Sequence, residues 1–171
     1  MTWTQFFRQE YFRVKESVFK ITFGGLHKLQ NYINYRPVIM YGSETWALRK
    51  REEQQLDRTE MRMLRWMLGI SLRERRRNDD IRAEAGVVAI SEKIREARMR
   101  WFGHIMRREE EDPVKVAWRH PIEGRRTVGR QRIRWRDIVE RDLGVLNLRE
   151  EEAQDIIYWR QRTRATDPTS D

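Results

Sequence analysis

The chain has 171 residues, with 36 lysines and arginines against 27 aspartates and glutamates, for a formal net charge of +9. It contains no cysteine, which excludes disulfides and thiolate zinc sites. A basic balance made mostly of arginine is typical of chains that meet nucleic acid or an anionic surface, although a basic helical protein without such a partner would have the same composition.

The N-terminus lacks the basic-then-apolar pattern of a secretory signal, and the longest apolar run, Val38–Tyr41, is far shorter than a membrane span. We therefore expect an intracellular protein, nuclear or cytoplasmic, with no membrane partner. Charged residues make up 37% of the chain and apolar residues 39%. This balance predicts amphipathic helices around thin cores, joined by basic loops.

The pattern divides the chain into a degenerate N-terminal helical segment (residues 1–40), a helical body (41–164) and a frayed tail (165–171). In the first segment, aromatic and aliphatic residues at helical spacing predict a helix that ends at Gly24–Gly25. A second short helix follows. Pro37 cannot continue a helix interior, so we expect the chain to turn or restart there.

The segment Tyr41–Trp46 predicts a turn into a long helix, which Ser43 or Thr45 would cap and which would end at Gly69. The apolar stripe of this helix is predicted to consist of Leu56, Met63, Leu64 and Met67, with Trp66 on its flank.

A basic connector follows at residues 71–77, and Asn78 is expected to cap a short helix that Gly86 closes. Ser91 then begins a longer helix, with Ile90 packed back against its first turns. This longer helix is predicted to bury Ile94, Ala97, Trp101 and Ile105, and to expose Arg95, Arg98 and Arg100.

The acidic run Glu109–Asp112 is expected to end that helix, and Pro113 to begin a short one. After a loop at residues 120–132, a further helix ends at Gly144. Its inward side is predicted to carry Trp135, Ile138, Val139 and Leu143. The last helix runs from about Leu148 to Arg164 and packs Ala153, Ile156 and Trp159 on one side. No strand pair or internal repeat is predicted, so the fold class is all-α.

Four stretches carry a resemblance to a known family, and they occur in the order in which that family has them. They are Pro37–Trp46 (PVIMYGSETW), Arg100–Arg107 (RWFGHIMR), Gly129–Asp137 (GRQRIRWRD) and Asp155–Arg160 (DIIYWR). Over roughly residues 22 to 164, the chain resembles the thumb and post-thumb region of the endonuclease–reverse transcriptase of non-LTR (LINE-type) retrotransposons. The resemblance implies a region that contacts template RNA and target DNA behind the polymerase.

The chain departs from this family in ways that bear on activity. The family's polymerase holds two metal ions with aspartates of a Y-x-D-D turn, and this sequence has no such turn. The one Asp pair, Asp79–Asp80, follows Asn78 at a predicted helix start. Gln131 replaces the family's proline, and the segment before Pro37 is shorter than in the family. The upstream endonuclease domain is absent as well, so we expect no enzyme activity, no catalytic residues and no cofactor.

Gly124–Arg136 is the strongest candidate for binding nucleic acid. It contains no acid, its glycines allow close approach to a phosphate chain, and its arginines can neutralise phosphates. These arginines are Arg125, Arg126, Arg130, Arg132, Arg134 and Arg136. The alternative is a solvated, flexible basic loop. A second, weaker candidate is the connector, with Arg75, Arg76 and Arg77, for which a solvated surface is the favoured interpretation.

Trp101, Trp135 and Trp159 could stack on bases, but their helical spacing with aliphatic residues favours core packing. His104 is expected to cap or pack within its helix, with phosphate contact as the lesser alternative. His27 and His120 share no ligand spacing with His104, so no metal site is predicted.

Other hypotheses remain beside the binding fragment. A helix-turn-helix would need a shorter link than the one before Ser91. A nuclease would need converging acids, whereas the acids here alternate with arginines as surface ion pairs do. An inert helical relic or adaptor would pair its arginines with its own acids. The favoured hypothesis is a non-catalytic fragment that binds RNA or DNA, has no small-molecule substrate, and self-associates through apolar faces left exposed.

Overall fold

The computed structural model describes residues 35–120 and 133–167, and the chain divides into two compact units, Met1–Ile39 and Met40–Asp171. The helices expected before residue 35 lie outside the described residues. Residues 35–40 are helical, so the chain does not turn at Pro37 itself, and the alternative of a helix that restarts there depends on residues before 35, which lie outside the described residues. The chain turns instead at Gly42, whose φ of 68° is in the left-handed region that favours glycine.

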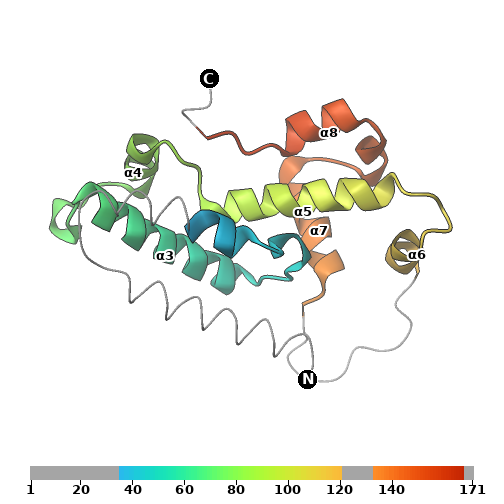
Figure 1. The fold of residues 1–171 in the computed structure, drawn as a ribbon, viewed down its shortest axis with the longest axis horizontal. Helices are drawn as coiled ribbons and strands as arrows, with labels where there is room; N and C mark the ends of the chain where they lie inside the picture. The colour runs from blue at the N-terminus through green and yellow to red at the C-terminus, as the bar shows by residue number, and fades with distance from the viewer. Residues whose placement is uncertain (1–34, 121–132, 168–171) are drawn as a thin grey trace. The chain divides into compact units, whose positions relative to one another are not determined.

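The second unit is built from helices alone in its described part, which confirms the all-α class (Figure 1). Its elements are η1 (Ser43–Thr45), α3 (Lys50–Leu68), η2 (Leu72–Glu74), α4 (Asn78–Ala85), α5 (Ile90–Met106), α6 (Pro113–Arg119), α7 (Trp135–Leu146), η3 (Glu150–Gln154) and α8 (Ile156–Thr163). Helix α5 is the centre of this unit, because it packs against η1, α3, α6, α7, η3 and α8. No helix among the described residues is long and apolar enough to span a membrane.

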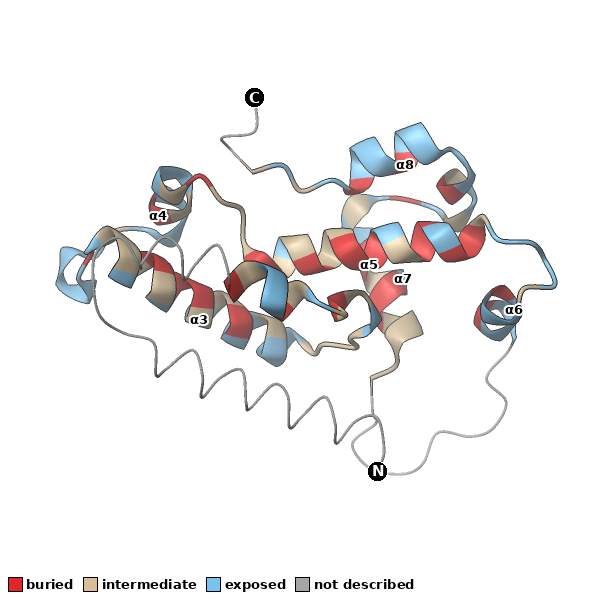
Figure 2. Cartoon of the chain, in the orientation of Figure 1, coloured by how far each residue is buried: buried red, intermediate tan, exposed pale blue. Residues whose placement is uncertain are grey.

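Helix α3 begins later than its sequence predicts. Ser43 and Thr45 form a separate short 3-10 turn, and α3 starts at Lys50, where the Glu52 carboxylate accepts the N–H of Arg49 at 2.8 Å. Gly69 ends the helix with a φ of 71°, as predicted. The buried face of α3 consists of Leu56, Glu60, Met61 and Leu64 (Figure 2), so the predicted stripe is confirmed at Leu56 and Leu64, whereas Met63 and Met67 are only half-buried.

The N-termini of α4 and α5 are not capped by the residues that the sequence suggests. Asn78 lies inside α4, and its side-chain oxygen accepts a hydrogen bond from Arg65 at 3.1 Å. At the start of α5, Glu60 accepts the N–H of Ile90 at 3.0 Å, and Asp57 accepts the hydroxyl of Ser91 at 2.9 Å. Two carboxylates of α3 therefore cap α5 from outside, where the helix dipole favours negative charge.

Arg98 was expected on the solvent side of α5, and that expectation is wrong. Its side chain is 1% exposed and binds the equally buried Asp142 of α7, with 2.5 Å between its Nη2 and the Oδ2 of Asp142 and 2.7 Å between Nε and the same oxygen. The Glu53 carboxylate of α3 lies 3.8 Å from Arg98. A buried guanidinium needs such a carboxylate, because leaving it unpaired in the core costs several kcal/mol, about 3–5 when one partner is removed.

The apolar core surrounds the C-terminal half of α5. Phe102 lies at its centre, with its ring 5.0 Å from that of Trp118 and 6.0 Å from that of Trp159. The indole N–H of Trp159 donates to the Met99 carbonyl at 2.9 Å, which fixes α8 on α5. Gly103 permits this contact, since an added Cβ would lie 2.6 Å from the Trp159 Nε1.

The C-terminal region differs from its prediction in three places. Helix α7 continues past Gly144 to Leu146, and Asn147 caps it with a φ of 52°. The predicted last helix is split at Asp155, which caps α8 and leaves Ile156 exposed. Residues 165–167 are bound to the body, because Asp167 accepts the N–H of Val88 at 2.9 Å. The rest of the expected frayed tail lies outside the described residues.

We expect Gly103→Ala to lower the free energy of unfolding by about 1–3 kcal/mol, since the new methyl would press on a buried and hydrogen-bonded ring. The control is Gly144→Ala, where nothing lies within 4 Å of the added Cβ. There we expect a gain of about 0.5–1 kcal/mol, because alanine is the better helix former. Urea unfolding of the two variants checks this, and equal effects would contradict the close α5–α8 approach.

Candidate nucleic-acid interface

Four of the predicted loop arginines, Arg125, Arg126, Arg130 and Arg132, lie outside the described residues. The remaining two, Arg134 and Arg136, flank the first residue of α7. Asp137 accepts the backbone N–H of Arg134 at 2.9 Å, while the Arg136 guanidinium lies 4.7 Å from the Trp118 ring centroid. Neither guanidinium has a carboxylate partner among the described residues. Because a helix N-terminus is itself positive, their position favours a bound anion.

The connector arginines are largely engaged within the protein. The carboxylate of Glu84 lies 2.6 Å from Arg76, and that of Asp79 lies 3.7 Å from Arg77. Arg75 is exposed and has a φ of 52°, and it caps the C-terminus of η2. Arg65 donates to the Arg76 carbonyl at 2.8 Å and so ties the connector to α3. These contacts favour a solvated connector over a nucleic-acid site.

The three candidate tryptophans have different environments. Trp159 is 1% exposed and belongs to the core, as spacing predicted. Trp101 and Trp135 are only half-buried. The Trp135 N–H donates to the Glu44 carbonyl at 2.7 Å, which anchors the ring and leaves part of its surface open. Trp101 and Trp135 therefore remain available for contact with a ligand, and Trp159 does not.

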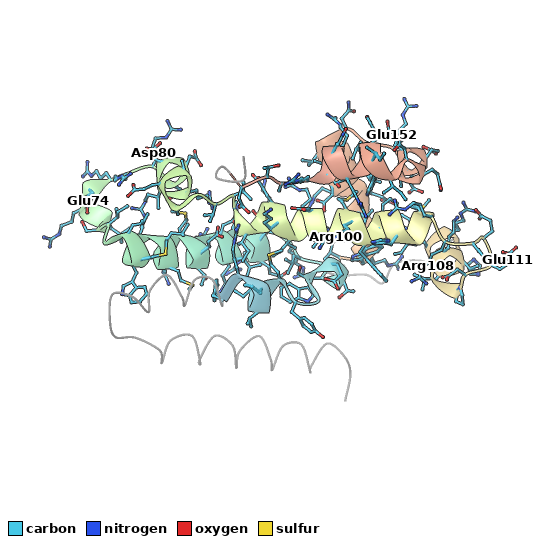
Figure 3. The ribbon with its side chains drawn as sticks, turned by 45° about the horizontal axis from the view of Figure 1, so that its top comes forward. Glu74, Asp80, Arg100, Arg108, Glu111 and Glu152 are labelled. Atoms are coloured by element: carbon cyan, nitrogen blue, oxygen red, sulfur yellow. The ribbon has the colours of Figure 1, made fainter. Side chains whose placement is uncertain are left out.

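A group of basic residues that the sequence did not single out as a site lies where α5 and α8 pack together. We call it the α5–α8 cluster, and its members are Arg100, His104, Arg107, Arg108 and Arg160. Arg100 and His104 lie four residues apart on α5, Arg107 caps its C-terminus, and Arg108 lies in the turn that follows; Figure 3 labels Arg100 on the helix and Arg108 near its end. Helix α8 adds Arg160 through tertiary packing, which no local sequence signal could reveal.

His104 is exposed, so the expectation that it caps or packs within its helix is wrong. Its pKa is lowered first by partial burial, then by the positive charges of Arg107, Arg160, Arg100 and Arg108. Burial and the charge of Arg160 likewise lower the pKa of Arg107. Burial is the first cause of both pKa shifts, and in both of them neighbouring arginines add to it.

The acids near the α5–α8 cluster neutralise it only in part. Asp112 pairs with Arg108 at 2.9 Å, and Glu96 lies 4.0 Å from Arg100. Arg107 donates to the Ala153 carbonyl at 2.6 Å, a neutral partner. Within the described residues the guanidinium of Arg160 has no carboxylate partner. The cluster therefore keeps a net positive charge that a phosphate could neutralise.

Trp101 lies beside both Arg108 of the α5–α8 cluster and the N-terminus of α7. The Arg108 guanidinium lies 5.8 Å from the Trp101 ring centroid. Trp101 also lines a cavity together with Arg134 and Arg136. Arg108, Arg134 and Arg136 thus border one aromatic surface, which could accept phosphates and bases of the same strand.

The described residues do not bring acids together as a metal-dependent nuclease would need. No group of three or more histidines or carboxylates in residues 35–120 and 133–167 could hold a metal ion. The most buried acids instead have structural partners, namely Glu60 at the start of α5 and Asp142 on Arg98.

Comparison with known proteins gives one informative match. Over 113 residues the chain is 29% identical to an uncharacterized transposon-derived protein of Caenorhabditis elegans. The match covers 63% of this chain and 40% of that protein, so the chain spans well under two thirds of its relative. The similarity supports a transposon-derived origin. No family model and no solved structure matches the chain.

We expect the pKa of His104 to lie below its ordinary value and to rise when Arg160→Gln removes one of the neighbouring charges. The matched control is Arg162→Gln on the same helix, where the guanidinium donates to the Leu146 carbonyl and is not among the charges that lower the pKa. An NMR titration of the His104 ring measures both. A pKa that is the same in both variants and in wild type would contradict the cluster.

Proposed function

We propose that this chain binds the phosphate backbone of RNA or DNA without catalysing a reaction, as a fragment of a non-LTR retrotransposon reverse transcriptase. The contacts would come from the α5–α8 cluster, from Arg134 and Arg136, and from the other arginines of the 124–136 segment. The transposon-derived relative supports the origin. The ordered family-like stretches support the reverse-transcriptase part of the proposal.

The observation that carries the proposal is the incomplete neutralisation of the α5–α8 cluster. Placing like charges together costs folding free energy, and a protein with no anionic partner gains nothing from it. Arg107 and Arg160 lie close enough for the charge of Arg160 to lower the pKa of Arg107. A phosphate between such residues would accept charge-assisted hydrogen bonds from both guanidinium groups and remove their repulsion.

The family-like stretch Arg100–Arg107 contributes three of the five cluster members, namely Arg100, His104 and Arg107, and Arg108 directly follows it. Its apolar positions, Phe102 and Gly103, are buried and serve packing. The stretch therefore has two roles in this proposal, since its inner side fixes α8 and its outer side contacts phosphate. No polymerase step is proposed, because the chain has no Y-x-D-D turn.

The test is binding to labelled single-stranded RNA and duplex DNA over a salt series. We expect the triple variant Arg100→Gln, Arg108→Gln and Arg160→Gln to bind more weakly and with a flatter salt dependence. Each lost phosphate contact should reduce the log–log slope by about 0.7 on single strands and about 0.9 on duplex DNA. A variant with alanine at Arg125, Arg126, Arg130, Arg132, Arg134 and Arg136 should flatten the slope further.

The matched control is the triple variant Arg51→Gln, Arg58→Gln and Arg62→Gln on the exposed side of α3, which lowers the net charge equally. It should keep the wild-type slope. Glutamine at Arg75, Arg76 and Arg77 should have a small effect, since two of these arginines already pair with acids. Equal losses of affinity in all the triple variants would mean that the protein attracts nucleic acid only through its overall positive charge. If the folded wild type does not bind near physiological salt, the proposal fails and the inert helical relic is favoured.

A further inference from the structure

An open cavity of about 370 Å³ lies among α5, α6 and α7. Three indole rings line it, those of Trp101, Trp118 and Trp135, and Arg134 and Arg136 complete the wall. Aromatic walls beside guanidinium groups are unusual on a surface this rich in charge. They combine a stacking surface with a positive rim, so the cavity has the chemistry of a ligand site.

The walls of the cavity are fixed before any ligand arrives. The Trp118 and Trp135 rings pack edge to face, with 5.7 Å between their centroids. Their N–H groups are bound as well, to the Glu44 carbonyl at 2.7 Å for Trp135 and to the Glu150 carboxylate at 3.4 Å for Trp118. Because these rings are already ordered, binding a flat ligand would cost little side-chain conformational entropy.

We propose that this cavity receives one unpaired nucleobase of a single-stranded RNA or DNA, while Arg134 and Arg136 hold the adjoining phosphates. The proposal rests on the proposed function and adds a strand preference to it. A nucleobase is a flat aromatic group attached to an anionic chain, and the cavity offers indole faces beside two guanidinium groups without carboxylate partners in the described residues. An apolar side chain of another protein would contact the indoles and leave Arg134 and Arg136 without an anionic partner.

The cavity should accept any base, since stacking is the main contact that it can provide. Apart from the two arginines, the one polar side chain in its wall is Thr45, whose hydroxyl already donates to the Gly42 carbonyl at 2.9 Å. A base within a duplex has both faces stacked and cannot enter. The cavity therefore distinguishes single strands from duplexes and does not read sequence.

Two valines of α6 provide a matched pair of variants. Val114 is 39% exposed and lines the cavity, whereas Val116 is 46% exposed and does not line it. Val114→Phe should fill the cavity without changing any charge, and Val116→Phe adds the same ring elsewhere on the helix. Binding is measured with a short oligouridylate, with the same backbone carrying abasic sites, and with duplex DNA, each over the same series of salt concentrations.

We expect wild type to bind the abasic strand about 5- to 100-fold more weakly than the intact strand. Val114→Phe should lose affinity for the intact strand by a similar factor and keep its affinity for duplex DNA. Val116→Phe should behave as wild type on all three probes. The salt slope should not change in either variant, because no phosphate contact is removed.

Equal binding of intact and abasic strands, unaffected by Val114→Phe, would overturn the base-binding cavity and leave backbone binding standing. No binding of wild type to any probe would overturn both proposals. If Val114→Phe changes the stability or the oligomeric state of the protein but not its binding of the oligouridylate, the occupant is this chain itself or a second copy, and the proposal also fails.

Discussion

The buried ion pair between Arg98 and Asp142 is the interaction on which the rest of the described body depends. Burial is the largest cause lowering the pKa of Arg98, and the carboxylate of Asp142 opposes it. The same pair draws in Glu53 from α3 and Arg141 from α7, whose Nη2 lies 2.5 Å from the Oε1 of Glu53. Helices α3, α5 and α7 are thus joined by ion pairs, because a buried charge whose partner is removed costs several kcal/mol.

This arrangement places Arg134 and Arg136 of α7, together with Arg108 just after α5, around one aromatic surface. With α7 held against α5, Arg134 and Arg136 come beside Trp101, and the Trp159 contact at Gly103 brings Arg160 to His104. The inner sides of these helices are satisfied by ion pairs and hydrogen bonds. Their outer sides keep positive charge and open indole faces, which is the combination that the proposed binding of a single strand uses.

The sequence predicted most of the helices, but it did not predict the residues of other helices that cap their ends. Gly69, Gly86 and Pro113 were identified correctly as helix boundaries, because left-handed glycines and a proline in the first helical turn act locally, whereas α5 ends at Met106, before the acidic run expected to end it. The start of α5 was misjudged because its caps come from Asp57 and Glu60 of another helix.

The same limit applies to charged residues. Spacing along α5 could not show that Arg98 meets Asp142, because the two residues are brought together only by the packing of α5 on α7. Spacing also could not show that Arg160 of α8 lies close enough to His104 to lower its pKa. By contrast, Arg76 and Arg77 pair with acids of the following helix, close in sequence, which the alternating charges of that region already indicated.

The most direct test of this account is a double-mutant cycle on the central ion pair, followed by urea unfolding and by oligonucleotide binding. Arg98→Met or Asp142→Leu alone should each cost about 3–5 kcal/mol, because each leaves a buried charge without its partner. The double variant should recover most of that stability and regain the wild-type salt slope. Additive losses, or single losses below about 1 kcal/mol, would contradict the claim that this pair sets the positions of α5 and α7.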